Sequence, residues 1–167
     1  MIKRVGLVVA GIAAVAAMSA PSAVADAGEA AAPGWKGTYE WSPGHAGGMR
    51  LDLAQSANRV DIWRANGHAN QRWQTYSYGG GLFAFRNRAT LKCLWYTGLD
   101  NQMTTGPCDD SRSHKFRGTR TNGYWTFKPL ADTRQCVDVR GRGTSNGTAV
   151  VTHWCNGDSN QRWYSHS

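Results

Sequence analysis

Two carboxylates and one aromatic ring stand out in this 167-residue chain as side chains that could do chemistry together. Asp61 and Trp63 alternate with Val60 and Ile62, so a strand that turns the aliphatic pair inward turns Asp61 and Trp63 outward. Asp52 lies a short way upstream. An ionised carboxylate makes strong hydrogen bonds to hydroxyl groups, and an outward indole is unfavourable in water unless a ligand covers it. The pattern predicts a surface for a ligand with both polar and apolar faces.

A pair of carboxylates can also act as the acid and base of a hydrolase. Asp52 and Asp61 are expected to lie in a shallow site without apolar burial, so neither pKa would be raised enough for an acid. The chain has no G-x-S-x-G motif and no His pair at metal-binding spacing, and its four cysteines are expected in disulfides. We therefore predict no enzymatic activity, no cofactor and no metal site.

The chain carries an internal repeat. The string Asn-Gln-Arg-Trp occurs at 70–73 and again at 160–163, and a degenerate copy, Ser-His-Lys-Phe, lies between them at 113–116. The closing aromatic residues of the three copies, Trp73, Phe116 and Trp163, are 43 and 47 residues apart. This regular spacing predicts three related structural units.

A second set of markers gives the unit boundaries. The markers are the strings Arg50-Leu51-Asp52, Cys93-Leu94-Trp95 and Cys136-Val137-Asp138, and their first residues are 43 residues apart. The units run over 36–77, 78–120 and 121–167.

Each unit predicts short strands and no helix. Thr38–Trp41, Leu82–Phe85 and Tyr124–Phe127 are alternating or aromatic-rich stretches, and Gly, Asn, Ser and Pro interrupt the chain between them. Units of about 40 residues also occur in propellers, but three blades are too few for a propeller. We predict an all-β fold, a β-trefoil of three pseudo-symmetric four-stranded repeats whose closing aromatic residues meet in the core.

The repeats also choose among the three possible disulfide pairings. Cys108 and Cys155 each lie 8 residues before the closing aromatic residue of their unit, and Cys93 and Cys136 open the markers of the same two units. The expected bridges are therefore Cys93–Cys108 and Cys136–Cys155. Unit one has Arg50 and Ala65 at the matching positions, so both members of the pair are missing together.

The first residues predict export. Lys3 and Arg4 precede an apolar run, and the small residues of 23–25 form an A-x-A cleavage pattern. The apolar run is too short for a comfortable membrane span, so no integral membrane segment is expected. The expected division is a secretory signal peptide at 1–25, a flexible lead-in at 26–35 and the domain of a secreted, extracellular protein at 36–167.

The charge is basic but diffuse. The formal net charge is +8, and the loss of Lys3 and Arg4 with the signal peptide lowers it to +6. The arginines are scattered without forming the stripe that is typical of nucleic-acid binding. We expect no nucleic-acid partner, and a monomer.

The closing Asn-Gln-x-Trp motifs, the opening string Cys136-Val137-Asp138-Val139 and the later string Cys155-Asn156-Gly157 resemble the ricin-type β-trefoil lectins, also known as family 13 carbohydrate-binding modules. The resemblance extends from about Trp35 to the end of the chain. It implies one shallow sugar pocket per unit, built from an opening Asp, a polar residue, an aromatic platform and the closing Asn and Gln. A pyranose suits such a pocket because its C–H face packs on a ring while its hydroxyls meet carboxylate and amide groups.

In unit one the resemblance implies a complete carbohydrate-binding set, which is Asp52, Asp61, Trp63, Asn70 and Gln71. For Gln71 and Gln161 an alternative role is to hold the loop and orient the Asp.

In unit three the implied set is Asp138, Val151, His153, Asn160 and Gln161. The position of Trp63 aligns with His153 rather than with Trp154, unless a bulge turns Trp154 toward the ligand. Val151 cannot replace the hydrogen bonds of Asp61, so the two sites are expected to differ in preference.

Unit two lacks the set, because Trp95 replaces the Asp, Gly106 the platform, and Ser113 and His114 the Asn-Gln pair. We expect this unit to be structural. The whole chain is predicted to be a lectin-like module whose partner is carbohydrate, either galactose-type sugars or a polysaccharide such as xylan. The alternative is a β-trefoil whose loops inhibit a secreted hydrolase or contact another protein.

Overall fold

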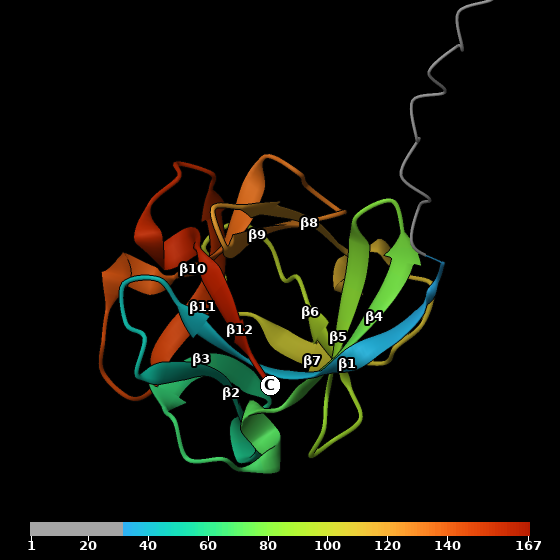
Figure 1. Ribbon diagram of the computed structural model, residues 1–167. Coiled ribbons are helices and arrows are strands. Elements are labelled where there is room, and N and C mark those ends of the chain that lie inside the picture. The colour runs from blue at the N-terminus through green and yellow to red at the C-terminus, as the bar shows by residue number, and fades with distance from the viewer. Residues whose placement is uncertain (1–31) are drawn as a thin grey trace, which may run out of the picture.

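The computed structural model describes residues 32–167, whose twelve strands form one hydrogen-bonded sheet system (Figure 1). The predicted signal peptide, residues 1–25, and most of the predicted lead-in lie outside the described residues. Within the described range, no helix is long and apolar enough to cross a membrane.

Six strands close a barrel because each pairs with the next around a ring. β1 pairs antiparallel with β4, β4 with β5, β5 with β8, β8 with β9, β9 with β12, and β12 returns to β1. The barrel strands are β1 (Gly34–Pro43), β4 (Trp73–Gly79), β5 (Leu82–Asn87), β8 (Phe116–Thr121), β9 (Tyr124–Pro129) and β12 (Trp163–His166).

The other six strands form three hairpins, one in each unit, and β3 joins them by pairing with both β11 and β7. The hairpin strands are β2 (Met49–Ala54), β3 (Arg59–Arg64), β6 (Cys93–Trp95), β7 (Thr104–Gly106), β10 (Gln135–Val139) and β11 (Thr148–Trp154). The 3-10 turns are η1 (Gln55–Ala57), η2 (Ala69–Gln71), η3 (Arg112–His114), η4 (Arg140–Arg142) and η5 (Ser159–Gln161). Four strands per unit, around one barrel, make the predicted β-trefoil.

The closing aromatic residues belong to the hydrophobic core. Trp73, Phe116 and Trp163 begin β4, β8 and β12 and are buried, as the repeats predict. The Trp73 indole donates its Nε1–H to the carbonyl of Leu51 at 3.0 Å, and Trp163 donates to Val137 at 3.1 Å. Since Leu51 and Val137 belong to β2 and β10, the hairpins close the end of the barrel at which β4, β8 and β12 begin.

Both predicted disulfides are present. Cys93 is bonded to Cys108 and Cys136 to Cys155, with Cα atoms 5.1 and 5.0 Å apart. Each bridge closes a loop inside its own unit, which restricts the unfolded chain.

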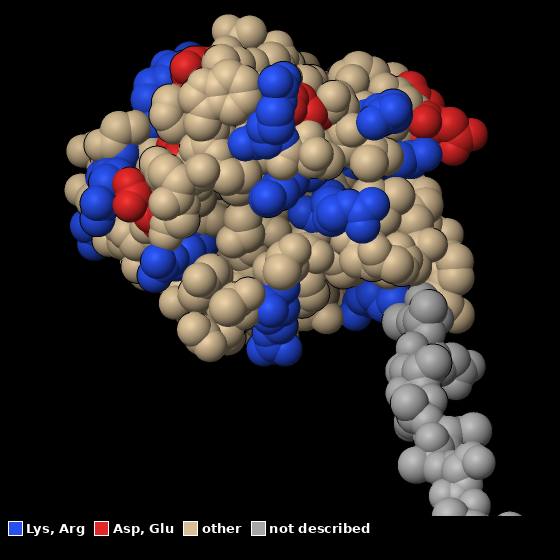
Figure 2. Space-filling model, turned by 90° about the horizontal axis from the view of Figure 1, so that it is seen from above, with Lys and Arg blue, Asp and Glu red and all other residues tan. Residues whose placement is uncertain are grey.

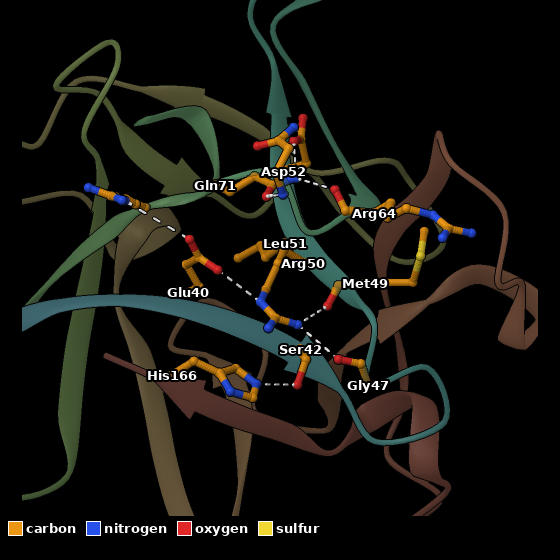
Figure 3. Close-up of polar contacts among 12 residues, drawn as sticks. Glu40, Ser42, Gly47, Met49, Arg50, Leu51, Asp52, Arg64, Gln71 and His166 are labelled. Atoms are coloured by element: carbon orange, nitrogen blue, oxygen red, sulfur yellow. Dashed lines mark hydrogen bonds and ion pairs between the residues drawn. The ribbon is translucent and has the colours of Figure 1, made fainter. Parts of the chain in front are cut away.

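In unit one Arg50 occupies the position of the first cysteine and makes polar contacts there instead (Figure 3). Its Nε donates to a carboxylate oxygen of Glu40 at 2.9 Å, and Nη1 donates to the carbonyls of Gly47 and Met49 at 2.8 and 2.9 Å. Ala65, at the position of the second cysteine, donates its backbone N–H to the carbonyl of Gly48.

β1 begins earlier than the sequence predicts. Gly34 and Trp35 fall inside the predicted flexible lead-in, but they pair with Ser77 and Tyr76 of β4. The Trp35 ring also contacts the Tyr76 ring edge-to-face at 5.2 Å. The prediction missed this because a start made of Ala, Gly and Pro carries no strand alternation.

Replacing Arg50 and Ala65 together by cysteine should create a third disulfide, because the two positions match Cys93 and Cys108 and both pairs are 15 residues apart. The bridge should stabilise the fold by about 3 kcal/mol relative to the R50S/A65S variant, which loses the same native contacts. Thermal unfolding and thiol titration measure this. Two reactive thiols in the oxidised, folded R50C/A65C protein would contradict the threefold equivalence.

Candidate functional site

The closing motif of unit one reaches the carboxylate of Asp52 (Figure 3). Asn70 Nδ2 donates to both carboxylate oxygens at 2.9 and 3.0 Å, and Gln71 Nε2 donates to Oδ2 at 2.9 Å. Gln71 also donates to the carbonyl of Arg64 at 3.1 Å and accepts the backbone N–H of Asn66 at 3.0 Å. Gln71 is fully buried. Its contacts therefore fit the alternative role, in which Gln71 holds the loop and orients Asp52 rather than touching the ligand.

A shallow pocket of about 220 Å³ opens beside this network. It is lined by Asp52, Leu53, Ala54, Gln55, Trp63, Asn66 and Asn70. Burial raises the pKa of Asp52 above its ordinary value, and the hydrogen bonds from Gln71 and Asn70 act in the opposite direction. A carboxylate offers about four acceptor positions, and the three bonds from Asn70 and Gln71 leave one of them on Oδ1.

Trp63 forms a wall of the pocket and is 41% exposed, so its ring is not packed in the core. A loop of unit three lies beside it. Gly147 donates its backbone N–H to the carbonyl of Ile62 at 2.9 Å, and the Asn146 side chain accepts the N–H of Arg64 at 2.8 Å. Sequence reasoning missed these loop residues because the repeat does not show which neighbouring unit borders a pocket.

Asp61 is the main correction in unit one. Its side chain is on the same face of β3 as Trp63, as the alternation predicts, but it is only 1% exposed and does not line the pocket. The residue lies between Asp52 of β2 and Ala149 of β11, and β11 is a strand of another unit. The prediction of a solvent-facing Asp61 is wrong because the sheet continues past β3.

Burial also changes the electrostatics of Asp61. Neither carboxylate oxygen has a hydrogen-bond partner among the described residues. Burial and then repulsion from Asp52 raise the pKa of Asp61 to about 6, while Arg59, at 3.9 Å, acts in the opposite direction. The expectation that no burial would raise a carboxyl pKa is therefore wrong for Asp61. Asp61 does not line the pocket of Trp63, so a ligand in that pocket would not contact this acid.

Unit three repeats the network of unit one. Asn160 Nδ2 and Gln161 Nε2 each donate to Oδ2 of Asp138 at 2.9 Å. Gln161 also donates to the carbonyl of Trp154 at 2.9 Å and accepts the N–H of Asn156 at 3.0 Å. Burial raises the pKa of Asp138, and the bonds from Gln161 and Asn160 oppose that rise.

His153 takes the platform position in unit three. It pairs with Cys136 as Trp63 pairs with Arg50, and the register of β10 with β11 continues without a bulge to Trp154. The alternative in which a bulge turns Trp154 to the ligand is therefore wrong. Trp154 instead lies under the Arg134 guanidinium, 5.3 Å from its ring centroid.

The surroundings of His153 differ from those of Trp63. Its Nδ1 lies 2.6 Å from a carboxylate oxygen of Asp100, which belongs to a loop of unit two. Val151, at the position of Asp61, is buried in β11. The two units thus share the fixed Asp but present different neighbouring groups.

In unit two, aromatic side chains fill the positions of the polar network. A Cβ atom at Gly106 would lie 2.7 Å from the Trp95 ring, so the glycine makes room for that indole. The ring stacks with buried His114 at 6.4 Å, and its Nε1 donates to the carbonyl of Pro107 at 2.9 Å. Aromatic packing therefore occupies the positions that carry Asp and Gln in the other units.

The surface charge agrees with the scattered pattern in the sequence. On the face shown in Figure 2, Lys and Arg side chains lie in several separate groups with Asp and Glu among them. Within the described residues, no group of three or more His, Cys, Asp or Glu side chains gathers as metal ligands would.

Replacing Asp61 by Asn should stabilise the protein near pH 7.5 more than near pH 4. Between its ordinary pKa of 3.8 and its folded pKa of about 6, the folded chain keeps a proton that the unfolded chain has released. The free energy of unfolding of the wild type therefore falls as the pH rises to about 6, because Asp61 must ionise in its buried position. The Asn variant has no proton to lose and avoids this fall. Between pH 4 and pH 7.5 the free energy of unfolding of the Asn variant should rise by roughly 2 kcal/mol relative to that of the wild type, as measured by urea unfolding. An equal difference at both pH values would contradict a buried, ionisable Asp61.

Comparison with known proteins adds the family. Residues 81–167 match the family described as the ricin-type beta-trefoil lectin domain, which is half of the chain. The probable lipoprotein EnvE of Salmonella typhimurium is 30% identical over 63 residues, 38% of this chain, and the match spans only 32% of that protein.

Three solved structures share the fold. The designed threefold symmetric protein ThreeFoil matches with a TM-score of 0.72 at 20% identity, over 78% of this chain and 98% of that chain. The ricin B-like lectin of Macrolepiota procera, in complex with lactose, matches with a TM-score of 0.67 at 19% identity, over 77% of this chain and 94% of that chain. The exo-beta-1,3-galactanase 1,3Gal43A of Clostridium thermocellum matches with a TM-score of 0.71 at 19% identity, over 78% of this chain and 30% of that chain. With the matched repeats and the closed barrel, the chain belongs to the ricin-type β-trefoil lectin domain family.

Proposed function

We propose that the protein is a secreted, non-catalytic lectin-like domain that binds galactosides, or a polysaccharide such as xylan, mainly through unit one. One observation carries the proposal. An exposed Trp63 ring lies in the same pocket as Asp52, whose carboxylate is fixed by Asn70 and Gln71.

This arrangement suits a single saccharide ring. The C–H face of a pyranose would pack on Trp63 and remove its exposed area from water. One sugar hydroxyl would donate to the acceptor position left on Oδ1 of Asp52. The Asn70 side chain uses its Nδ2 on Asp52, which leaves its carbonyl oxygen as an acceptor for a second hydroxyl.

Unit three supports a second site of different preference. Asp138 accepts both amide bonds on Oδ2, and its Oδ1 accepts no hydrogen bond from the described residues, while the residue is 3% exposed. His153 offers a smaller ring than Trp63, and Asp100 adds a second carboxylate beside it. We propose that this site is the weaker one and that it contributes by avidity on polymeric glycans.

Galactosides are the first class to test. The Macrolepiota procera lectin is in complex with lactose, and the Clostridium thermocellum relative is an exo-beta-1,3-galactanase. Xylan is the second ligand to test, because a pocket of about 220 Å³ accepts one ring of an extended chain as well as a terminal sugar.

The W63A variant should lose at least about tenfold in affinity for lactose, because it removes the aromatic platform. W154A is the matched control, since Trp154 is 44% exposed, is also near the end of a hairpin strand and lies outside the pocket. Isothermal titration with lactose and with xylo-oligosaccharides measures both variants. If W63A binds the preferred sugar as wild type does, or W154A loses binding equally, the proposal fails.

Unit three should matter only for multivalent ligands. On a polymeric galactan matrix W63A should be retained weakly, and W63A/H153A should elute with the void volume because both platforms are gone. H153A alone should bind lactose as wild type does. Full retention of the double variant would place binding elsewhere, and inhibition of a secreted hydrolase would then become the function to test.

Secretion is part of the proposal. Two disulfides are typical of proteins that fold outside the cytosol. Protein recovered from the culture medium of an expressing bacterium should begin at Asp26, as read by N-terminal sequencing. Recovery only from the cytosol, with Met1 in place, would contradict this part.

A further inference from the structure

The end of the barrel opposite the hairpins contains a cavity of about 520 Å³. The Trp73 contact places the hairpins where β4 begins, and the cavity lies where β4 ends, at the Gly79–Gly81 turn. Figure 1 shows the β4–β5 hairpin beside the start of β1 at this end. The cavity is thus separate from the pocket of Trp63, and its volume is in the range of small-molecule sites.

The walls of the cavity are aromatic. The inward residues of β1, β5 and β9 supply two rings each: Tyr39, Trp41, Phe83, Phe85, Trp125 and Phe127. The rings meet edge-to-face, with Trp41 5.2 Å from Phe127 and Phe83 5.4 Å from Trp125. The alternating strands place small side chains between them, namely Thr75 and Ser77 of β4 and Ser165 of β12. This combination leaves a hollow with flat apolar sides.

Two buried polar atoms at this cavity have no partner among the described residues. They are the indole Nε1 of Trp41 and the hydroxyl Oγ1 of Thr75, and both residues are 5% exposed. Ser77 Oγ accepts one bond, from the N–H of Gly79, and its hydroxyl proton has no acceptor among the described residues. Because buried polar groups are nearly always paired, unpartnered polar atoms on residues that line a cavity indicate a ligand with matching polar atoms.

The charge around the cavity favours an anion. Lys36 and Arg120 line it, and no Asp or Glu is among its lining residues. Neither cation forms an ion pair with a carboxylate among residues 32–167. A carboxylate would supply the missing negative charge and could accept a paired hydrogen bond from the guanidinium.

We propose that the open end of the barrel is a second binding site, for a small planar aromatic carboxylate that carries a hydroxyl group. The ring lies between the aromatic walls, the hydroxyl meets Trp41 and Thr75, and the carboxylate faces Lys36 and Arg120. This site works independently of the saccharide pocket.

The charge requirement is tested with 2-naphthoate and its neutral analogue 2-naphthylmethanol, titrated calorimetrically into the mature chain. Wild type should bind one 2-naphthoate, about tenfold more tightly than the neutral probe. K36Q/R120Q should remove this preference and leave 2-naphthylmethanol unchanged. R88Q, which changes an exposed arginine outside the cavity, should behave as wild type.

The hydroxyl requirement is tested with 6-hydroxy-2-naphthoate. It should bind wild type about fivefold more tightly than 2-naphthoate, and T75V should abolish this advantage while leaving 2-naphthoate binding unchanged. T75V replaces an unpaired hydroxyl by a methyl group of the same shape, so its stability should equal or exceed that of wild type.

W63A keeps both the cavity and its charges, so it should bind all three probes as wild type does, whatever its affinity for sugar. Several results would overturn the proposal: no binding of 2-naphthoate by folded wild type, equal affinity for the charged and neutral probes, or equal losses in K36Q/R120Q and R88Q. A protein dimer in sedimentation that R120Q dissociates would assign this end to a second copy of the chain instead.

Discussion

The amide side chains of Gln71 and Gln161 hold the fold and the proposed binding surface together. Each donates to the Asp that opens its unit and to a carbonyl at the end of the second hairpin strand, and each accepts a loop N–H. Two residues later, Trp73 or Trp163 donates its indole N–H to the carbonyl before that Asp. One short segment therefore fastens the hairpin to the barrel and fixes the carboxylate. A ligand meets an oriented acceptor without the loss of side-chain freedom that a mobile one would suffer.

Unit two shows that the fold does not need the Asp–Gln contact at this place. Phe116 fills the core position without donating a hydrogen bond, and Trp95 stacked on His114 replaces the Asp–Gln contact. The disulfide Cys93–Cys108 restrains the same loop. A unit can thus lose the Asp–Asn–Gln network and still form its part of the barrel. The network is present in the two units proposed to bind a ligand and absent from the structural one.

Sequence alone predicted what the repeat determines. The identical closing strings placed Trp73 and Trp163 in the core and paired the cysteines. The resemblance to the lectin family implied that Asn70 lies beside Asp52. All of these contacts lie within a unit. Sequence reasoning failed where units meet. The burial of Asp61 depends on β11, and the loop at Gly147 borders Trp63 from another unit. The bulge at Trp154 was left open, since only the observed pairing fixes the register. The cavity at the open end arises from small residues on strands of different units, a pattern that no single repeat displays.

The central claim is that Trp63 and the fixed Asp52 together hold a sugar ring, and the indole signals of the protein report on it directly. The chain has eight tryptophans, each with its own Nε1–H resonance once assigned. During titration with lactose, or with xylobiose if that is the ligand bound, the account predicts a saturable shift of the Trp63 resonance, with those of Trp73, Trp154 and Trp163 unmoved. A bound sugar that leaves the Trp63 resonance in place would contradict the account.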